Sequence, residues 1–127
     1  MIVTREQLLK IGKLIHDIKL KNLKCNINLK YKILKLENII KEEFEMTNIL
    51  LNDLSLKYAE LDDNKEPIIK DGGIKIIAEQ VINLQQELND FYKATIQLPD
   101  YYFSLDELEE LNLDWEKTEA FIPFIKE

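Results

Sequence analysis

Hydrophobic residues recur at helical spacing along most of the chain. Near the amino terminus, Thr4 followed by Gln7 matches a capping box. Apolar positions then alternate at steps of three and four residues: Leu8, Ile11, Ile15 and Ile18. This pattern predicts a first helix over residues 5–20, which Gly12 weakens slightly. Asparagine-rich residues without a clear period predict a connection over 21–28.

A much longer apolar stripe follows and predicts a second helix over residues 29–61, with about nine turns. Its positions are Leu29, Ile33, Leu36, Ile40, Phe44, Leu51, Leu54, Tyr58 and Leu61, with Thr47 as the single polar member. No short loop covers such a stripe, so a second helix must pack along it. Turn-forming residues over 62–73, with Pro67 inside the segment, end the helix.

A third stripe predicts a helix over residues 74–91 that folds back antiparallel on the long one; it consists of Ile74, Ile77, Val81, Leu84, Leu88 and Phe91. The predicted fold class is therefore mainly α. We expect a single domain over 1–127, built as a long antiparallel, coiled-coil-like helical hairpin with an amino-terminal helix, a short β segment and a small helical tail. The predicted seam of the hairpin consists of Ile33, Leu36, Ile40, Phe44, Leu51, Leu54, Ile77, Val81, Leu84 and Leu88.

After the third helix the period changes to two, which predicts a strand over residues 92–98 that Pro99 ends. The partner of this strand is open: the segment 67–70, or the edge of another chain.

The carboxy-terminal part predicts short acidic helices within residues 104–122. Ser104 with Glu107 forms a second capping box, and Asp114 can cap a last turn or two. The apolar residues of this tail are expected to pack on the hairpin or on a partner: Trp115, Phe121, Ile122, Phe124 and Ile125.

Charge is divided unevenly between the two parts of the sequence. Residues 1–41 hold ten basic and three acidic side chains, a net charge of +7, whereas the other 86 residues hold seven lysines and 21 acidic residues, a net charge of −14. Such a division points to an electrostatic partner, which is either the acidic part of the same or a neighbouring copy, or an outside polyion. The candidate acidic surface consists of Asp106, Glu107, Glu109, Glu110, Asp114 and Glu116.

The sequence offers little catalytic or metal-binding chemistry. His16 and Cys25 are the only residues of their types, too few for a zinc site or a thiol–imidazole pair, and Asp71-Gly72-Gly73 lacks the remaining residues of a phosphate-binding loop. We therefore expect no catalytic residue, cofactor or metal, and no enzyme. With one cysteine, no signal core and no apolar run near the roughly 20 residues of a membrane span, we expect a soluble cytoplasmic protein that binds no membrane.

Nucleic acid is disfavoured as a partner. The lysine-rich residues 1–41 could contact phosphates, and Tyr31 offers one stacking ring. Against that, the chain has one arginine, no recognisable reading motif and a net charge of −7, which repels nucleic acid at long range.

The order of these pieces resembles a family. A helix with a lysine-rich end and a long Lys/Glu helix precede Lys57-Tyr58-Ala59-Glu60-Leu61-Asp62-Asp63-Asn64, a returning helix with Glu87-Leu88, and an acidic ending over 104–113 with the apolar segment 121–125. This order is similar to that of small helical proteins of unassigned function encoded by bacteriophages of low-GC bacteria. The resemblance implies a phage origin, a non-enzymatic role, and a place in the cytoplasm of the infected cell or on the virion.

Two functional hypotheses follow from these observations. The leading one is a protein–protein interaction or assembly protein that binds its own copies, as a homo-oligomer, or another host or phage protein through the hairpin. The alternative is an inhibitor of a host defence protein, such as a CRISPR effector, whose basic groove is occupied by an acidic surface that imitates nucleic acid.

Overall fold

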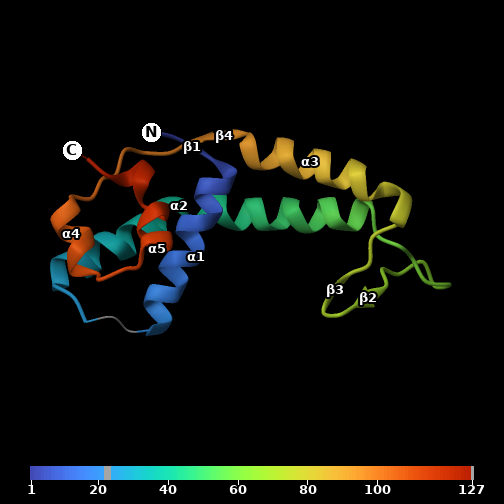
Figure 1. Cartoon of the computed structure of the whole chain (residues 1–127), viewed down its shortest axis with the longest axis horizontal. Coiled ribbons are helices and arrows are strands. Elements are labelled where there is room, and N and C mark those ends of the chain that lie inside the picture. Colours follow the sequence, from blue (N-terminus) through green and yellow to red (C-terminus); the bar gives the residue numbers. More distant parts are fainter. Residues whose placement is uncertain (22–23, 127) are drawn as a thin grey trace.

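The computed structural model describes residues 1–21 and 24–126. A compact head lies at one end of the molecule, and an arm of two helices projects from it (Figure 1). The helices are α1 (Arg5–Lys21), α2 (Ile27–Lys57), α3 (Val81–Lys93), α4 (Leu105–Glu110) and α5 (Trp115–Ala120), with 3-10 turns η1 (Ala78–Gln80) and η2 (Ile122–Phe124). The strands are β1 (Ile2–Thr4), β2 (Ile69–Lys70), β3 (Gly73–Ile74) and β4 (Thr95–Gln97). The predicted fold class, mainly α, is confirmed at this level.

Helix α1 begins at the predicted capping box. The Thr4 hydroxyl accepts a hydrogen bond from the Gln7 amide (3.1 Å), and the Gln7 side chain accepts one from the Thr4 amide (2.9 Å). The helix then continues to Lys21, and its apolar face is fully buried in the head. Local sequence and tertiary packing thus agree over the whole element.

Helix α2 begins and ends earlier than the predicted range 29–61. Asn26 caps its start, because the Asn26 side chain accepts a hydrogen bond from the Asn28 amide (2.8 Å). The helix ends at Lys57, since the following residues turn into extended backbone and form bridges, Ala59 with Ile76 and Leu61 with Pro67. The helical period of the sequence continues to residue 61, but the last four residues, 58–61, lie in the turn and the bridged segment and not in the helix.

The core of the head lies where α1 crosses the first part of α2, with the carboxy-terminal tail packed against both (Figure 1). It consists mainly of Leu8, Ile11, Leu14, Ile15, Ile18, Leu29, Ile33, Leu36, Ile40, Phe103, Leu108, Leu111, Phe121 and Phe124. Gly12 lies at the crossing: a β-carbon there would lie 2.3 Å from the ring of Phe44. The glycine therefore leaves room for the Phe44 ring of α2 against α1.

Strand β4 pairs with β1, a partner outside the two alternatives that the sequence suggested. The strands are antiparallel, and Val3 lies opposite Ile96. The strand is also shorter than the predicted 92–98, because residue 92 still belongs to α3. A three-residue β1 directly before a helix is too short to show a period of its own, and this explains why the pattern missed it.

The predicted helix over 74–91 is wrong in its first turns. Asp71 and Gly72 both have positive φ angles, 53° and 80°, and close a two-residue hairpin in which β2 pairs with β3. The backbone therefore remains extended through Ile74, forms the η1 turn and enters α3 only at Val81. Two hairpin strands thus occupy part of the predicted 62–73 loop and part of the predicted helix.

The tail contains both predicted caps. Ser104 and Glu107 form the full capping box of α4, and the Asp114 side chain accepts from the Lys117 amide (2.9 Å) at the start of α5. Phe121 and Phe124 are buried, as expected, but Trp115 is 76% exposed and Ile122 is 54% exposed. In the six-residue α5, Ala120 takes the inward position, so Trp115 at the first helical position faces outward.

Candidate interaction surface

The arm consists of residues 48–93: the second part of α2, the tip over 58–80, and α3 running beside α2 (Figure 1). Large apolar side chains on it remain exposed. On α2, an outer stripe at helical spacing begins at Met46, just before the arm, and continues along it through Ile49, Leu50 and Leu56; these residues are 39–62% exposed. At the start of α3, Val81 and Ile82 are 39% and 68% exposed. The arm therefore presents apolar surface that the head does not cover.

A groove of about 460 Å³ lies at the base of the arm, between α2, α3 and the start of α1. Its apolar walls are Leu50, Leu54 and Phe91, and its charged lining residues are Arg5, Glu87 and Asp90. We call these six residues the base groove. Leu50 belongs to both the groove and the outer stripe, so the two form one continuous surface.

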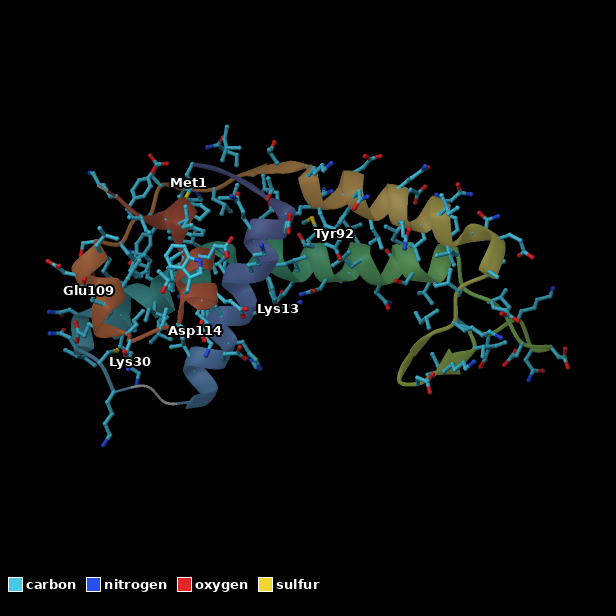
Figure 2. All side chains as sticks on the ribbon, viewed as in Figure 1. Met1, Lys13, Lys30, Tyr92, Glu109 and Asp114 are labelled. Carbon is cyan, nitrogen blue, oxygen red and sulfur yellow. The ribbon has the colours of Figure 1, made fainter. Side chains whose placement is uncertain are left out.

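Arg5 holds the base groove in place. Its guanidinium lies 4.2 Å from the centre of the Phe91 ring, and its amide donates to the Ala94 carbonyl (3.0 Å). In Figure 2, Tyr92 lies at this junction, where the end of α3 approaches α1. The pairing of β1 with β4 continues the same attachment, so the base of the arm is joined to the head by backbone and side chains together.

An ion pair links the two helices of the arm further out. The Lys57 ammonium lies 2.7 Å from the Glu87 carboxylate. The hydrogen bond that Glu87 accepts from Lys57 lowers the pKa of Glu87 below the ordinary value, and a further hydrogen bond from Tyr58 acts in the same direction. The same bond to Glu87 raises the pKa of Lys57. Both groups are charged at neutral pH, and Lys57 is committed to its partner.

The tip is ordered by a backbone network in which three segments meet. The Glu60 amide donates to the Lys75 carbonyl (2.8 Å), the Lys75 amide to the Ile68 carbonyl (2.8 Å), and the Ile68 amide to the Glu60 carbonyl (2.9 Å). The Asp62 side chain accepts from the amides of Asn64 (2.8 Å) and Glu66 (3.0 Å). The tip is thus a defined structure that extends the arm.

The predicted seam residues lie in two separate parts of the structure, the core of the head and the arm. Those in the first part of α2 lie in the core of the head with α1 and the tail: Ile33, Leu36 and Ile40, with Phe44 half-buried beside Gly12. The others belong to the arm: Leu84 is buried, Leu51, Leu54, Ile77 and Leu88 are half-buried, and Val81 is exposed. The ten residues therefore share a periodicity without sharing one interface.

The predicted acidic surface is partly used inside the head. Glu107 pairs with Lys32 (2.8 Å), Glu110 accepts from the Asn26 amide (2.6 Å), and Asp114 caps α5. The remaining residues are exposed: Asp106, Glu109 and Glu116. Figure 2 shows Glu109 on α4 at the outer end of the head. Part of the charge division is therefore satisfied within the chain, since Lys32 of α2 pairs with Glu107 of the tail.

Sequence reasoning missed the base groove and the outer stripe. A signal for the stripe was present, because Met46, Ile49 and Leu50 follow a second helical period beside the main one. No sequence signal marks the groove, because it depends on how the start of α1 approaches the end of α3. That approach becomes visible only with the Arg5–Phe91 contact.

The two residues weighed for metal or thiol chemistry lie apart from the arm surface. His16 is exposed beside a cavity of about 240 Å³ that it shares with Phe44, and Cys25 is half-buried before α2. Within residues 1–21 and 24–126, no group of three or more His, Cys, Asp or Glu residues is placed to hold a metal ion. In the same residues, no helix is long and apolar enough to cross a membrane.

Comparison with known proteins returned no match: no family model, no curated protein and no solved structure is similar to the chain.

Proposed function

We propose that this protein is a non-enzymatic, phage-type interaction protein that docks its arm on another protein chain during assembly. The supporting observation is the contrast between the two parts of the molecule. The exposed apolar side chains of the head, such as Ile27 (75%) and Trp115 (76%), belong to separate elements, whereas those of the second part of α2 form one helical stripe, of which Ile49 at 62% is the most exposed member. Exposed apolar surface that is continuous along a projecting element is typical of protein-binding sites. The site of action is the cytoplasm of the infected cell or the virion.

In this proposal α3 and the second part of α2 pack as a short coiled-coil-like pair that presents the docking surface. Leu84 and the half-buried Leu51, Leu54 and Leu88 face into the pair, and Lys57 with Glu87 fixes its register. The exposed side chains of the outer stripe lie beside this contact and remain available to a partner. A homo-oligomer formed through the stripe is one form of this function, and a complex with a different protein is the other.

The experiment is site-specific photo-crosslinking in the cells where the protein naturally occurs. A photoreactive amino acid replaces Ile49 on the arm or, as a matched control, Leu34 on the head, which is also exposed. We expect crosslinks to one discrete protein chain from position 49 and none from position 34. Absence of a crosslink at position 49, or equal products from both positions, would contradict the proposed function.

A second candidate function is inhibition of a basic, nucleic-acid-handling host protein. It is supported by the exposed position of Asp106, Glu109 and Glu116 on the head, together with the net charge of −7. Its test is a salt-sensitive complex with a basic protein that the triple variant Asp106→Asn/Glu109→Gln/Glu116→Gln no longer forms. A complex that survives this triple substitution, or that high salt leaves unchanged, would contradict inhibition through the head.

A further inference from the structure

We infer that the base groove and the outer stripe together bind a basic amphipathic helix of a partner protein. This inference rests on the proposed function and narrows it to one chemical class of partner. A helix laid along α2 would place apolar side chains on the stripe and in the groove, and its basic side chains beside the carboxylates of the arm.

The shape of the surface suits a helix. The groove is open to solvent and has a volume of about 460 Å³, with Leu50, Leu54 and Phe91 as its apolar lining, which is enough space for large apolar side chains. From the groove the stripe continues along α2 through Ile49 to Leu56, at a spacing of seven residues. Apolar anchors at two-turn spacing on a partner helix would match this repeat.

The charges beside this surface favour a basic occupant. Asp53 lies on α2 between Ile49 and Leu56, and Asp90 lines the groove. Among the described residues neither carboxylate forms an ion pair, and two cations of this surface have other partners: Lys57 pairs with Glu87, and Arg5 lies over the ring of Phe91. Lysine or arginine on the partner would supply the missing counter-charge, and its aliphatic stem would cover the apolar walls.

A second copy of the chain fits less well. The arm holds five lysines and nine acidic residues, a net charge of −4, and the rest of the chain holds twelve basic and fifteen acidic residues, a net charge of −3. An arm that lay against the arm of another copy would therefore meet net negative charge. Two arms side by side would also bring Asp53 and Asp90 of one copy towards those of the other.

The test uses the full chain and a labelled, helix-forming peptide of leucine and lysine, with its leucines on one face, about five turns long. A scrambled peptide of the same composition is the control. By fluorescence anisotropy at low salt, we expect the patterned peptide to bind about tenfold more tightly than the scrambled one, and to lose affinity as salt is raised. Equal binding of both peptides, or no binding of the patterned one, would overturn the inference.

Matched variants locate the site. Asp53→Asn/Asp90→Asn removes two exposed charges from the arm, and Asp106→Asn/Glu109→Gln removes two from the head. We expect the arm variant to bind the patterned peptide about tenfold more weakly and the head variant to change its affinity less than about twofold. Equal losses in both variants would show general charge attraction and overturn the inference.

Light scattering separates this inference from the proposed function. An oligomer that persists at low and high salt and that Ile49→Asn converts to a monomer would identify a second copy as the occupant. That result would overturn the basic-helix inference and leave the proposed function standing. Conversely, no photo-crosslink from position 49 would contradict the proposed function itself, whatever the peptide binds.

Discussion

Gly12 shows how one residue makes room for a ring from a neighbouring helix. A glycine in a helix interior costs up to about 1 kcal/mol relative to alanine, so this position would gain stability from alanine if space were available. The added carbon would lie 2.3 Å from the Phe44 ring, so the ring would have to move out of its place. We expect Gly12→Ala to lower the free energy of unfolding by about 1–2 kcal/mol net, since overpacking costs about 1–3 kcal/mol. Urea denaturation measures this change.

The control for Gly12 is a double-mutant cycle with its neighbour. In a Phe44→Ala background the ring is gone, so Gly12→Ala should become neutral or stabilising by up to about 1 kcal/mol. If Gly12→Ala cost the same with and without the Phe44 ring, the close approach would not explain the glycine.

Lys32 of α2 contacts three groups of the tail. Its ammonium lies 2.8 Å from both the Glu107 carboxylate and the Tyr102 carbonyl, and 4.7 Å from the centre of the Phe103 ring. Burial raises the pKa of Glu107, but the hydrogen bonds from Lys32 and Ser104 together outweigh it, so the pKa lies below its ordinary value of 4.5. The folded state therefore favours the charged form of Glu107.

This pKa direction predicts how stability depends on pH. Because the pKa of Glu107 is lower in the folded chain than in the unfolded one, its stabilisation is complete above about pH 4.5 and is lost as the pH falls through the folded pKa. We expect Glu107→Gln to lower the free energy of unfolding by about 1 kcal/mol at neutral pH and by much less once the pH is below the folded pKa of Glu107. Denaturant titrations at both pH values measure the difference, and an equal loss at both would contradict the role of the charge.

At the scale of elements, the hydrophobic periodicity predicted where helices lie better than it predicted which elements pack against them. The first part of α2 was correctly predicted to bury Ile33, Leu36 and Ile40, but these residues meet α1 and the tail. A stripe indicates that a face is buried and does not indicate by which element. Caps, by contrast, depend on neighbours in the sequence, and those at Thr4 and Ser104 were both predicted correctly.

The tip shows a different reason for failure. Ile74 and Ile77 continue the helical spacing of α3, yet Ile74 pairs with Ile69 in a strand. The Asp71-Gly72 turn and the bridges to the end of α2 determine this conformation, and they involve contacts that periodicity does not contain. The base groove was missed for the same reason, because it combines residues from three helices.

The contrast between head and arm predicts two levels of local stability. Helix α1 and the first part of α2 bury most of the core, whereas α3 contains one buried residue, Leu84. Amide hydrogen exchange should therefore be slowest in α1 and over residues 29–40, and faster in α3 and over 48–57 through opening of the arm alone. Equal protection in α3 and α1 would contradict this order and would indicate that head and arm unfold as one unit.

At the scale of the whole molecule, the arm determines the shape. Helix α2 has 31 residues, so at about 1.5 Å per residue it is about 46 Å long, and the tip continues beyond its end. A compact globule of 127 residues has an expected radius of gyration of about 14 Å. The length of α2 alone exceeds the diameter that such a globule allows, so the projecting arm must raise this value.

We therefore expect small-angle X-ray scattering of the monomer to give a radius of gyration clearly above about 14 Å, with a distance distribution skewed to long distances. The backbone pairing of β1 with β4 and the Arg5–Phe91 contact hold the base of the arm, so high salt should leave the radius nearly unchanged. Low- and high-salt samples of matched concentration, with the mass of each confirmed by light scattering, make the comparison. A radius near 14 Å would mean that the arm folds back and covers its own stripe, which would remove the surface on which both proposals depend.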